Sequence, residues 1–142
     1  MPSPSRLDRR VVLASTYDLG HQPLGLSSPA AWLRDAGASV RCLDLSIDRL
    51  DEGAVKDAAF IAFHVPMHTA TRLASEIIPK VRALNPAAHI AAYGLYASVN
   101  EEHLLSLVVS TVIGGEYEAA LVAVYEGLAA GRDVARNGTT IH

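Results

Sequence analysis

Cysteine is almost absent from this sequence, since Cys42 is the single cysteine among 142 residues. One thiol excludes a disulfide within the chain, and it excludes an iron–sulfur cluster held by three or four cysteines of this chain. An excess of positive charge is also missing, because 12 Lys and Arg stand against 15 Asp and Glu without a basic stripe. A partner bound mainly through its phosphate backbone, such as nucleic acid, is therefore not expected.

Long apolar runs are missing as well. The run Ala58–Phe63 is far too short to cross a bilayer, and residues 1–10 lack the apolar core of a signal peptide. We therefore expect a soluble, cytoplasmic protein that does not bind a membrane. Half of the residues are hydrophobic, which is enough to build the core of one domain.

The familiar phosphate-binding motifs of α/β proteins do not occur. The sequence contains neither Gly-x-Gly-x-x-Gly nor Gly-Lys followed by Ser or Thr, so a dinucleotide site and a phosphate-gripping loop are not expected. The first loop holds Tyr17, Asp18, Leu19 and His21 in place of a Ser/Thr/Gly phosphate cradle, which argues against FMN.

Apolar segments alternate with helical patterns along the whole chain. Strands are expected at residues 10–15, 39–45, 59–65, 89–94 and 111–113, and helices at 25–36, 69–84, 101–108 and 119–130. This alternation predicts a three-layer, flavodoxin-like (Rossmann-like) α/β sandwich with a five-stranded parallel sheet in the order 2-1-3-4-5. We expect one domain at residues 10–131, a flexible leader at 1–9, and a polar tail or the start of a linker at 132–142.

Individual residues predict how some of these elements begin and pack. Ser27 or Ser28 is expected to cap the first helix with Pro29 in its first turn, and Trp32 is expected on the buried face. Residues 46–56 are expected to form a short polar connection. Pro79 is expected to kink or locally break the helix at residues 69–84.

Three segments of the sequence resemble one known family. They are Pro23-Leu-Gly-Leu26 leading to Ala31-Trp-Leu-Arg-Asp-Ala-Gly37, then Val40-Arg-Cys-Leu-Asp-Leu45, and then Gly114-Gly-Glu-Tyr-Glu-Ala-Ala-Leu121. In this order and spacing the sequence resembles, over residues 11–128, the cobalamin-binding-type amino-terminal domain of cobalamin-dependent radical S-adenosylmethionine enzymes.

The resemblance implies a bound cobalamin whose corrin lies over the carboxyl edge of the sheet, with its nucleotide tail threaded between loops. By position, the implied contacts are Thr16, Tyr17, Asp18, His21, Pro23, Gly25, Val65, Pro66, Met67, His68, Gly94, Leu95, Tyr96, Gly114, Gly115 and Glu116. In one branch of the family, the histidine of an Asp-x-His-x-x-Gly loop coordinates cobalt. Here Asp18, His21 and Gly25 are each one residue further apart, and His21 is the candidate cobalt ligand.

The resemblance also implies a catalytic partner. The family's chemistry needs a Cys-x-x-x-Cys-x-x-Cys motif that holds the cluster cleaving S-adenosylmethionine, and this chain has only Cys42. We therefore expect a corrinoid-binding domain or subunit that is not catalytic by itself and works with a radical S-adenosylmethionine catalytic domain or subunit. Formation of a homodimer is left open.

Two other functions fit the same residues. The chain is interpreted alternatively as a cofactor-free interaction domain that retained the fold. It is also interpreted as a small histidine metal-binding protein, in which His21, His64 and His68 converge at the strand ends.

Two further groups of side chains have open roles. Tyr93, Tyr96 and Tyr117 lie near expected strand ends, where their rings would wall either a corrin or a subunit interface. Glu116 and Glu118 either stabilise the amino end of the last helix through its dipole or contact a ligand.

Overall fold

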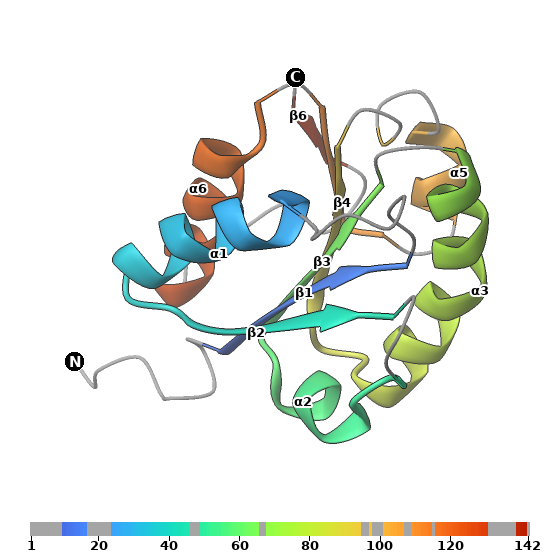
Figure 1. Cartoon of the computed structure of the whole chain (residues 1–142), viewed down its shortest axis with the longest axis horizontal. Helices are drawn as coiled ribbons and strands as arrows, with labels where there is room; N and C mark the ends of the chain where they lie inside the picture. Colours follow the sequence, from blue (N-terminus) through green and yellow to red (C-terminus); the bar gives the residue numbers. More distant parts are fainter. Residues whose placement is uncertain are drawn as a thin grey trace.

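A six-stranded parallel sheet forms the centre of the computed structural model (Figure 1). The structure describes residues 10–16, 24–45, 49–65, 68–94, 97, 101–106, 109–114, 116–130 and 139–141. The strands are β1 (Arg10–Ser15), β2 (Ser39–Asp44), β3 (Phe60–His64), β4 (His89–Tyr93), β5 (Thr111–Ile113) and β6 (Thr139–Ile141). Their order in the sheet is β2-β1-β3-β4-β5-β6, so the predicted flavodoxin-like α/β fold and its order 2-1-3-4-5 are confirmed.

The sixth strand was not predicted. Thr139 and Ile141 of β6 pair in parallel with Thr111 and Ile113 of β5, in a stretch that the sequence analysis placed in a polar tail. Three β-branched residues suit a strand, but a run this short has no apolar periodicity that would mark it in the sequence. Its pairing with β5 is what defines it, and that is a tertiary contact.

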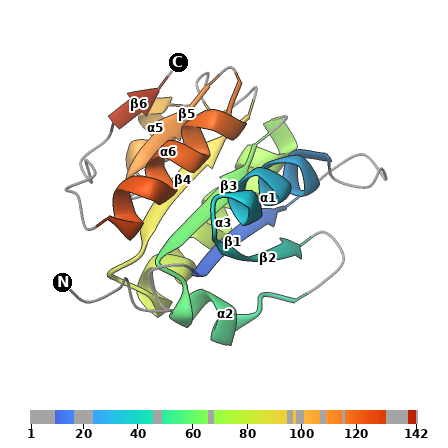
Figure 2. The same ribbon diagram turned by 90° about the vertical axis from the view of Figure 1, so that its left-hand side faces the viewer.

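Helices cover both faces of the sheet (Figure 2). One face packs against α1 (Leu24–Asp35) and α6 (Glu118–Ala129), and the other packs against α2 (Glu52–Asp57), α3 (His68–Leu84) and α5 (Glu101–Ser106). Both faces of the central strands are therefore buried, which explains why the sequences of β1, β3 and β4 are apolar without alternation.

Helix α1 begins earlier than predicted. It starts at Leu24, so Ser27 and Ser28 lie inside the helix and do not cap it, and Pro29 is an internal residue beyond the first turn. The Ser28 hydroxyl instead donates a hydrogen bond to the carboxylate of Glu118 on α6 (3.2 Å). The prediction failed because Ser and Pro favour helix starts only statistically, whereas packing of the preceding turn decides where a helix begins.

The prediction that Trp32 faces the core was wrong. Leu26, Ala30 and Leu33 lie four and three residues apart and form the buried stripe of α1, with exposures of 3%, 0% and 0%. Trp32 lies beside this stripe and is 52% exposed. The helical spacing identified the helix but did not decide which neighbouring residue turns inward.

Two further helices also differ from expectation. Helix α3 continues from His68 to Leu84 through Pro79, so the proline does not break it. The polar connection at residues 46–56 contains the start of α2, and the Asp51 side chain caps this helix by accepting a hydrogen bond from the Ala54 amide (3.1 Å). A six-residue helix is too short for its pattern to stand out in the sequence.

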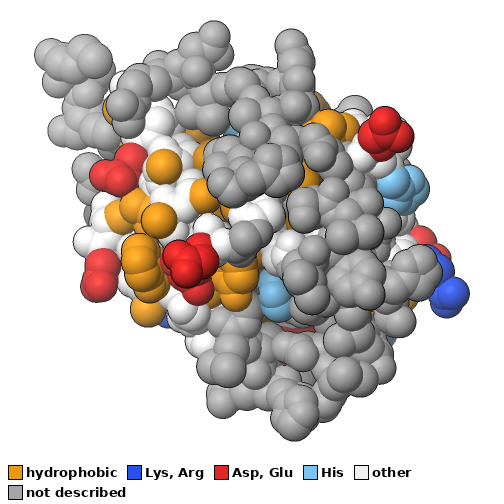
Figure 3. Space-filling model, turned by 90° about the horizontal axis from the view of Figure 1, so that it is seen from above, with side chains coloured by type: hydrophobic (Ala, Val, Ile, Leu, Met, Phe, Trp, Pro, Cys, Tyr) orange, Lys and Arg blue, Asp and Glu red, His pale blue; other side chains and the backbone are white. Residues whose placement is uncertain are grey.

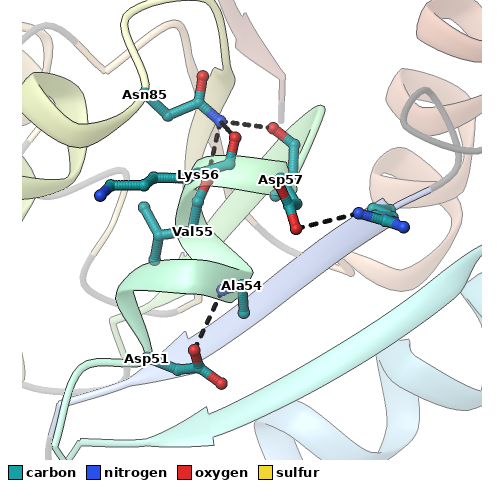
Figure 4. A network of polar contacts seen from close by, with 8 residues as sticks. Asp51, Ala54, Val55, Lys56, Asp57 and Asn85 are labelled. Carbon is teal, nitrogen blue, oxygen red and sulfur yellow. Dashed lines mark hydrogen bonds and ion pairs between the residues drawn. The ribbon is translucent and has the colours of Figure 1, made fainter.

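The amino-terminal end of the sheet is held together by polar side chains (Figure 4). The side-chain amide of Asn85, which is 8% exposed, donates to the carbonyl oxygens of Val55 (2.8 Å) and Ala58 (2.7 Å) at the end of α2. Its Nδ2 atom also lies 3.3 Å from the carbonyl oxygen of Lys56. The Val55 carbonyl also accepts from the Ala58 amide (3.3 Å), so Asn85 supplies a second donor to it and a donor to the Ala58 carbonyl at the end of the helix.

Candidate functional site

The predicted site falls at the carboxyl edge of the sheet. Thr16, Val65, Gly94 and Gly114 directly follow β1, β3, β4 and β5, and all four are buried. Because the strands are parallel, their carboxyl ends meet at this edge, where open α/β sheets bind ligands. Figure 3 views the molecule from above, and hydrophobic and acidic side chains gather on its left, where α1 and α6 lie in Figure 1.

Other predicted contacts lie next to this edge or outside the described residues. Gly25 is in the first turn of α1, His68 begins α3, and Glu116 is exposed just before α6. The predicted contacts outside the described residues are Tyr17, Asp18, His21, Pro23, Pro66, Met67, Leu95, Tyr96 and Gly115. The role of the whole set in cofactor binding stays a prediction.

Gly94 is required by the packing of two strand ends. Its φ is +116°, and a Cβ atom there would lie 2.9 Å from the Val65 carbonyl oxygen and 3.1 Å from His64 Cδ2. The amide of Val65 donates to the carbonyl of Tyr93 (2.7 Å), which extends the ladder between β3 and β4 to this point. Only glycine fits a backbone of this conformation pressed so closely against its neighbour.

A row of polar and aromatic side chains crosses the last position of the strands. Ser15 pairs in register with His64, and His64 with Tyr93. All three face α1 and α6, because residues two positions earlier on each strand belong to the core on that side. They are 0%, 8% and 0% exposed. The row is therefore a buried layer beneath the carboxyl edge.

Tyr117, which precedes α6, completes an aromatic cluster with this row. Its ring centroid lies 4.8 Å from that of Tyr93 and 6.0 Å from that of His64, and the His64 and Tyr93 rings are 5.2 Å apart. These separations are typical of rings in direct contact. The sequence analysis named Tyr93 and Tyr117 as walls of a corrin or a subunit interface, and His64 as a candidate metal ligand, but it did not group them with Ser15. The alignment of strand ends in a parallel sheet is a signal that could have grouped Ser15, His64 and Tyr93.

Burial keeps the tyrosines of the cluster neutral. Loss of hydration raises the pKa of Tyr93 well above its usual value of 10, and the neighbouring Tyr117, Cys42 and Glu118 raise it further. Partial burial also raises the pKa of Tyr117, with Glu118 adding to the effect. Both phenols therefore stay protonated to a more alkaline pH than a free tyrosine, and they offer a hydroxyl group rather than a phenolate.

The hydroxyl of Ser15 is the polar atom of this row that most needs a partner. Ser15 Oγ is buried and has no hydrogen-bond partner among the described residues. Leaving a buried hydroxyl unpaired costs on the order of 1–3 kcal/mol. A polar ligand atom at the carboxyl edge would remove this cost, and a corrin ring carries carboxamide side chains that could provide one. Ser15 is thus one described polar group at this edge whose chemistry fits a carboxamide of a corrinoid.

A cavity lies at the opposite end of the sheet. It has a volume of about 280 Å³ between β1, β2 and α2. Both arginines that line it form ion pairs, Arg10 with Asp57 (3.1 Å) and Arg41 with Asp51 (3.3 Å). Because both arginines are already paired with acidic side chains, the cavity is not a favourable binding site for an anion.

The alternative of a three-histidine metal site is tested only at His64. The His64 ring packs against Tyr93 and Tyr117. Within the described ranges, no three His, Cys, Asp or Glu side chains come together in a way that could hold a metal ion. His21 and the side chain of His68 lie outside the description.

Comparison with known families matches this architecture. The family model for the B12 binding domain matches residues 10–125, which includes β1 to β5 and most of α6. The chain belongs to the B12-binding domain family. No curated protein matches the sequence. The match extends across all the strands whose ends form the candidate edge, so the site described above lies within the B12-binding domain.

The B12-binding domain also resembles a solved structure. A crystal structure from Burkholderia pseudomallei, provisionally described as a pilus assembly-related protein, superimposes with a TM-score of 0.65 at 15% sequence identity. The match covers 92% of this chain and 96% of that chain. At this identity the likeness shows the fold alone.

Within the described part of the B12-binding domain, none of the helices has the length and apolarity needed to cross a bilayer.

Proposed function

We propose that this B12-binding domain binds a cobalamin over the carboxyl edge of its sheet and supplies it to a radical S-adenosylmethionine catalytic domain or subunit. The observation that carries the proposal is the family match over residues 10–125, whose strands bring the predicted contacts after β1, β3, β4 and β5 to one edge. The chain is not catalytic by itself, and we propose that it works in the cytoplasm.

The edge offers a suitable surface for a wide, flat ring. Gly94 and Gly114 have no side chains, and Thr16 and Val65 are buried at the ends of their strands. The backbone at the ends of four neighbouring strands can therefore approach the ring closely. The buried Ser15 hydroxyl beneath these strand ends has no hydrogen-bond partner among the described residues, and a polar atom of the ligand would provide one. When bound, a cobalamin supplies a cobalt ion, whose chemistry no side chain of this protein provides.

The proposed catalytic partner rests on the three sequence segments that resemble cobalamin-dependent radical S-adenosylmethionine enzymes. Such a partner must provide the three cysteines that hold an iron–sulfur cluster, because this sequence contains only Cys42. The protein's own contribution is to hold the corrinoid, orient it toward the partner and shield one of its faces from water. No nucleic acid or membrane is part of this proposal.

Direct titration tests the binding. Purified protein is mixed with hydroxocobalamin and desalted, and the absorption spectrum of the protein fraction is recorded. We expect the fraction to be coloured in about a one-to-one ratio, as one binding edge per chain requires. A colourless fraction with no spectral change on titration would refute cobalamin binding. Arg41→Ala, at the opposite end of the sheet, is the matched control and should bind as well as the wild type.

The axial ligand is tested separately. If His21 coordinates cobalt, His21→Ala will change the absorption spectrum of the bound cobalamin. An unchanged spectrum with retained binding would remove His21 from the site without affecting the rest of the proposal.

One observation favours a second candidate function, an interaction domain without a cofactor. Trp32 is a large apolar side chain left 52% exposed on α1. Isolated exposed side chains are common, but a tryptophan is also the residue that most often anchors an interface. This alternative predicts no corrinoid uptake and a concentration-dependent self-association that Trp32→Ala abolishes, measured by sedimentation velocity. A monomer at all concentrations would count against it.

A further inference from the structure

A hydrogen bond joins the beginnings of two helices on one face of the sheet. The hydroxyl of Ser28 on α1 donates to Oε1 of Glu118, the first residue of α6, over 3.2 Å in a partly buried place. Helix α1 starts at Leu24, so Ser28 lies about one turn beyond its first residue. The bond therefore connects the ends of α1 and α6 that lie nearest to the carboxyl edge of the sheet.

Each of these helix starts lies beside a segment with predicted cobalamin contacts. Gly25 is in the first turn of α1, and Gly114 and Glu116 just precede α6. The sheet does not bring these two segments together, because β3 and β4 separate β1 from β5. Three strand spacings of about 4.8 Å place the ends of β1 and β5 roughly 14 Å apart. The separation of the two segments therefore depends on how α1 packs against α6.

Much of the packing between α1 and α6 is apolar. Ala30 and Leu33 of α1 share one buried cluster with Leu121 and Val124 of α6. Hydrophobic contact is not directional, whereas a hydrogen bond to a carboxylate has a preferred distance and angle. The carboxylate of Glu118 is also favoured at the amino end of its own helix. The bond from Ser28 therefore gives the contact between the helices a defined register.

The same end of α6 is in contact with the strand ends. Tyr117 precedes Glu118, and its ring centroid lies 4.8 Å from that of Tyr93 and 6.0 Å from that of His64. Burial, with a smaller effect of the Glu118 carboxylate, raises the pKa of Tyr117 and of Tyr93, so the carboxylate lies close to both phenols. A shift of α6 relative to α1 would therefore also displace the side chains beneath the carboxyl edge.

We propose that Ser28 and Glu118 are positioning residues for the corrinoid. Their hydrogen bond holds the segment at the start of α1 and the segment before α6 at the separation that lets one ligand contact both. Neither side chain touches the ligand in this role. A site whose parts are held in place before binding loses less freedom when the ligand binds, which increases the affinity. This inference rests on the proposed function and adds the pair of residues that sets its affinity.

The affinity for cobalamin in variants of the pair tests this role. Hydroxocobalamin is titrated into the wild type, Ser28→Ala, Glu118→Ala and the double variant, and absorption gives each Kd. We expect each single substitution to weaken binding by about five- to tenfold. Adding Ser28→Ala to Glu118→Ala should change the affinity no further, because both substitutions remove the same hydrogen bond. If Ser28→Ala costs as much affinity in the Glu118→Ala background as in the wild type, the two side chains act independently and the inference is wrong.

Conservative variants test whether the hydrogen bond itself is responsible. Ser28→Thr keeps a hydroxyl donor and Glu118→Gln keeps an acceptor oxygen, so both should bind cobalamin within about twofold of the wild type. Ser27→Ala, at the exposed neighbouring position on α1, is the matched control and should bind as the wild type does. A loss of affinity in Ser27→Ala equal to that in Ser28→Ala would contradict the inference.

A variant at the amino end of the sheet separates positioning from a general loss of stability. Asn85→Ala removes buried hydrogen bonds far from the carboxyl edge, so it should lower the midpoint of urea denaturation and leave the affinity for cobalamin unchanged. Ser28→Ala should do the reverse, since its bond is only partly buried. If both variants lose affinity in proportion to their loss of stability, the affinity follows stability alone and the positioning role is refuted.

The failure of the proposed function has a different appearance in these titrations. If the wild type binds no hydroxocobalamin, the proposed function is wrong and the inference falls with it. If the wild type binds and both Ser28→Ala and Glu118→Ala bind equally tightly, the inference is overturned while cobalamin binding stands.

Discussion

The buried polar groups at the two ends of the sheet differ in their hydrogen bonding. At the amino end, His89 is 1% exposed, its Nε2 atom is hydrogen bonded to Thr111 Oγ1 (2.8 Å), and its ring meets the edge of Phe60 at 5.7 Å. At the carboxyl end, on the same face, Ser15 Oγ is buried with no hydrogen-bond partner in the described part of the chain. At the amino end His89 Nε2 and the Thr111 hydroxyl are thus paired with each other, whereas the Ser15 hydroxyl at the carboxyl end has no partner among the described residues.

Other side chains near the amino end of the sheet are also hydrogen bonded within the protein. Asn85 and the Asp51 cap fix α2 at the amino end. Arg82 adds hydrogen bonds to the carbonyl oxygens of Pro86 (3.1 Å) and Ala88 (2.6 Å) in the turn before β4. Polar contacts at this end therefore stabilise the fold. In open parallel sheets the carboxyl end is the one left for ligands, and the division seen here follows that rule.

The largest effect is expected from removing the Asn85 amide. Asn85→Ala removes the side-chain donor to the carbonyls of Val55 and Ala58 in a buried place, and we expect a loss of about 2–3 kcal/mol in the free energy of unfolding. Urea denaturation measures this loss. Corrinoid affinity should not change, since the network lies at the amino end. Lys56→Ala, a substitution at an exposed position on α2, is the control. An equal loss of stability in this variant would contradict the role of the Asn85 side-chain amide.

A smaller loss is expected from Thr111→Val. This change keeps the shape of the side chain and removes the partner of His89 Nε2, which should cost about 1–2 kcal/mol of the free energy of unfolding. A stability equal to that of the wild type in urea denaturation would mean that the amino end is not stabilised by internal pairing in the way the comparison requires.

The loss of stability at alkaline pH should depend on Tyr93. In the unfolded chain Tyr93 loses its proton near pH 10, whereas burial raises its pKa well above that value in the folded protein. The stabilising contribution is complete below pH 10 and falls as the pH rises further, because only the unfolded chain releases the proton. The slope for one such group is about 1.4 kcal/mol per pH unit. Tyr93→Phe should reduce the loss of stability above pH 10, measured by urea denaturation at several pH values.

Tyr117→Phe provides the matched control for this measurement. Tyr117 is only partly buried, and its pKa is raised less than that of Tyr93. The change at Tyr117 should therefore alter the alkaline stability less. An equal effect of both substitutions would contradict the different burial of the two phenols.

The smallest effect on stability is expected at Ser15. Ser15→Ala removes a hydroxyl without a described partner, so the free energy of unfolding should rise or change by less than about 0.5 kcal/mol. If this hydroxyl pairs with a carboxamide of the corrin, the same variant should weaken cobalamin binding by about three- to tenfold. A stability loss as large as that of Thr111→Val would remove the contrast between the two ends.

The fold was largely predictable because its signals are local. The apolar runs of β1, β3 and β4 mark strands that are buried on both faces, and the helical pattern at residues 119–130 lies within one residue of α6. Alternation of strands and helices with right-handed connections then restricts the strand order to few possibilities. The elements that escaped were short ones, α2 and β6, whose few residues carry no periodic signal.

The place of the strand ends was predictable, but the packing of the side chains beneath them was not. The expected edge follows from strand ends alone, and Thr16, Val65, Gly94 and Gly114 lie there. The contact of Tyr117 with Tyr93 depends on how α6 packs against the sheet, which the sequence does not state. The same holds for the exposure of Trp32, since one position along a helix turns a side chain by about 100°.

By itself, the sequence determined that this protein is a parallel α/β domain, because the apolar runs of buried strands and the polar residues that end them are consecutive in the sequence. Tertiary structure alone decided that Ser15, His64 and Tyr93 share one row, and that Tyr117 closes it. Residues that are 49 and 29 positions apart become neighbours only through the strand register. That register is set by the packing of the whole sheet between its two helical layers, and no single segment contains it.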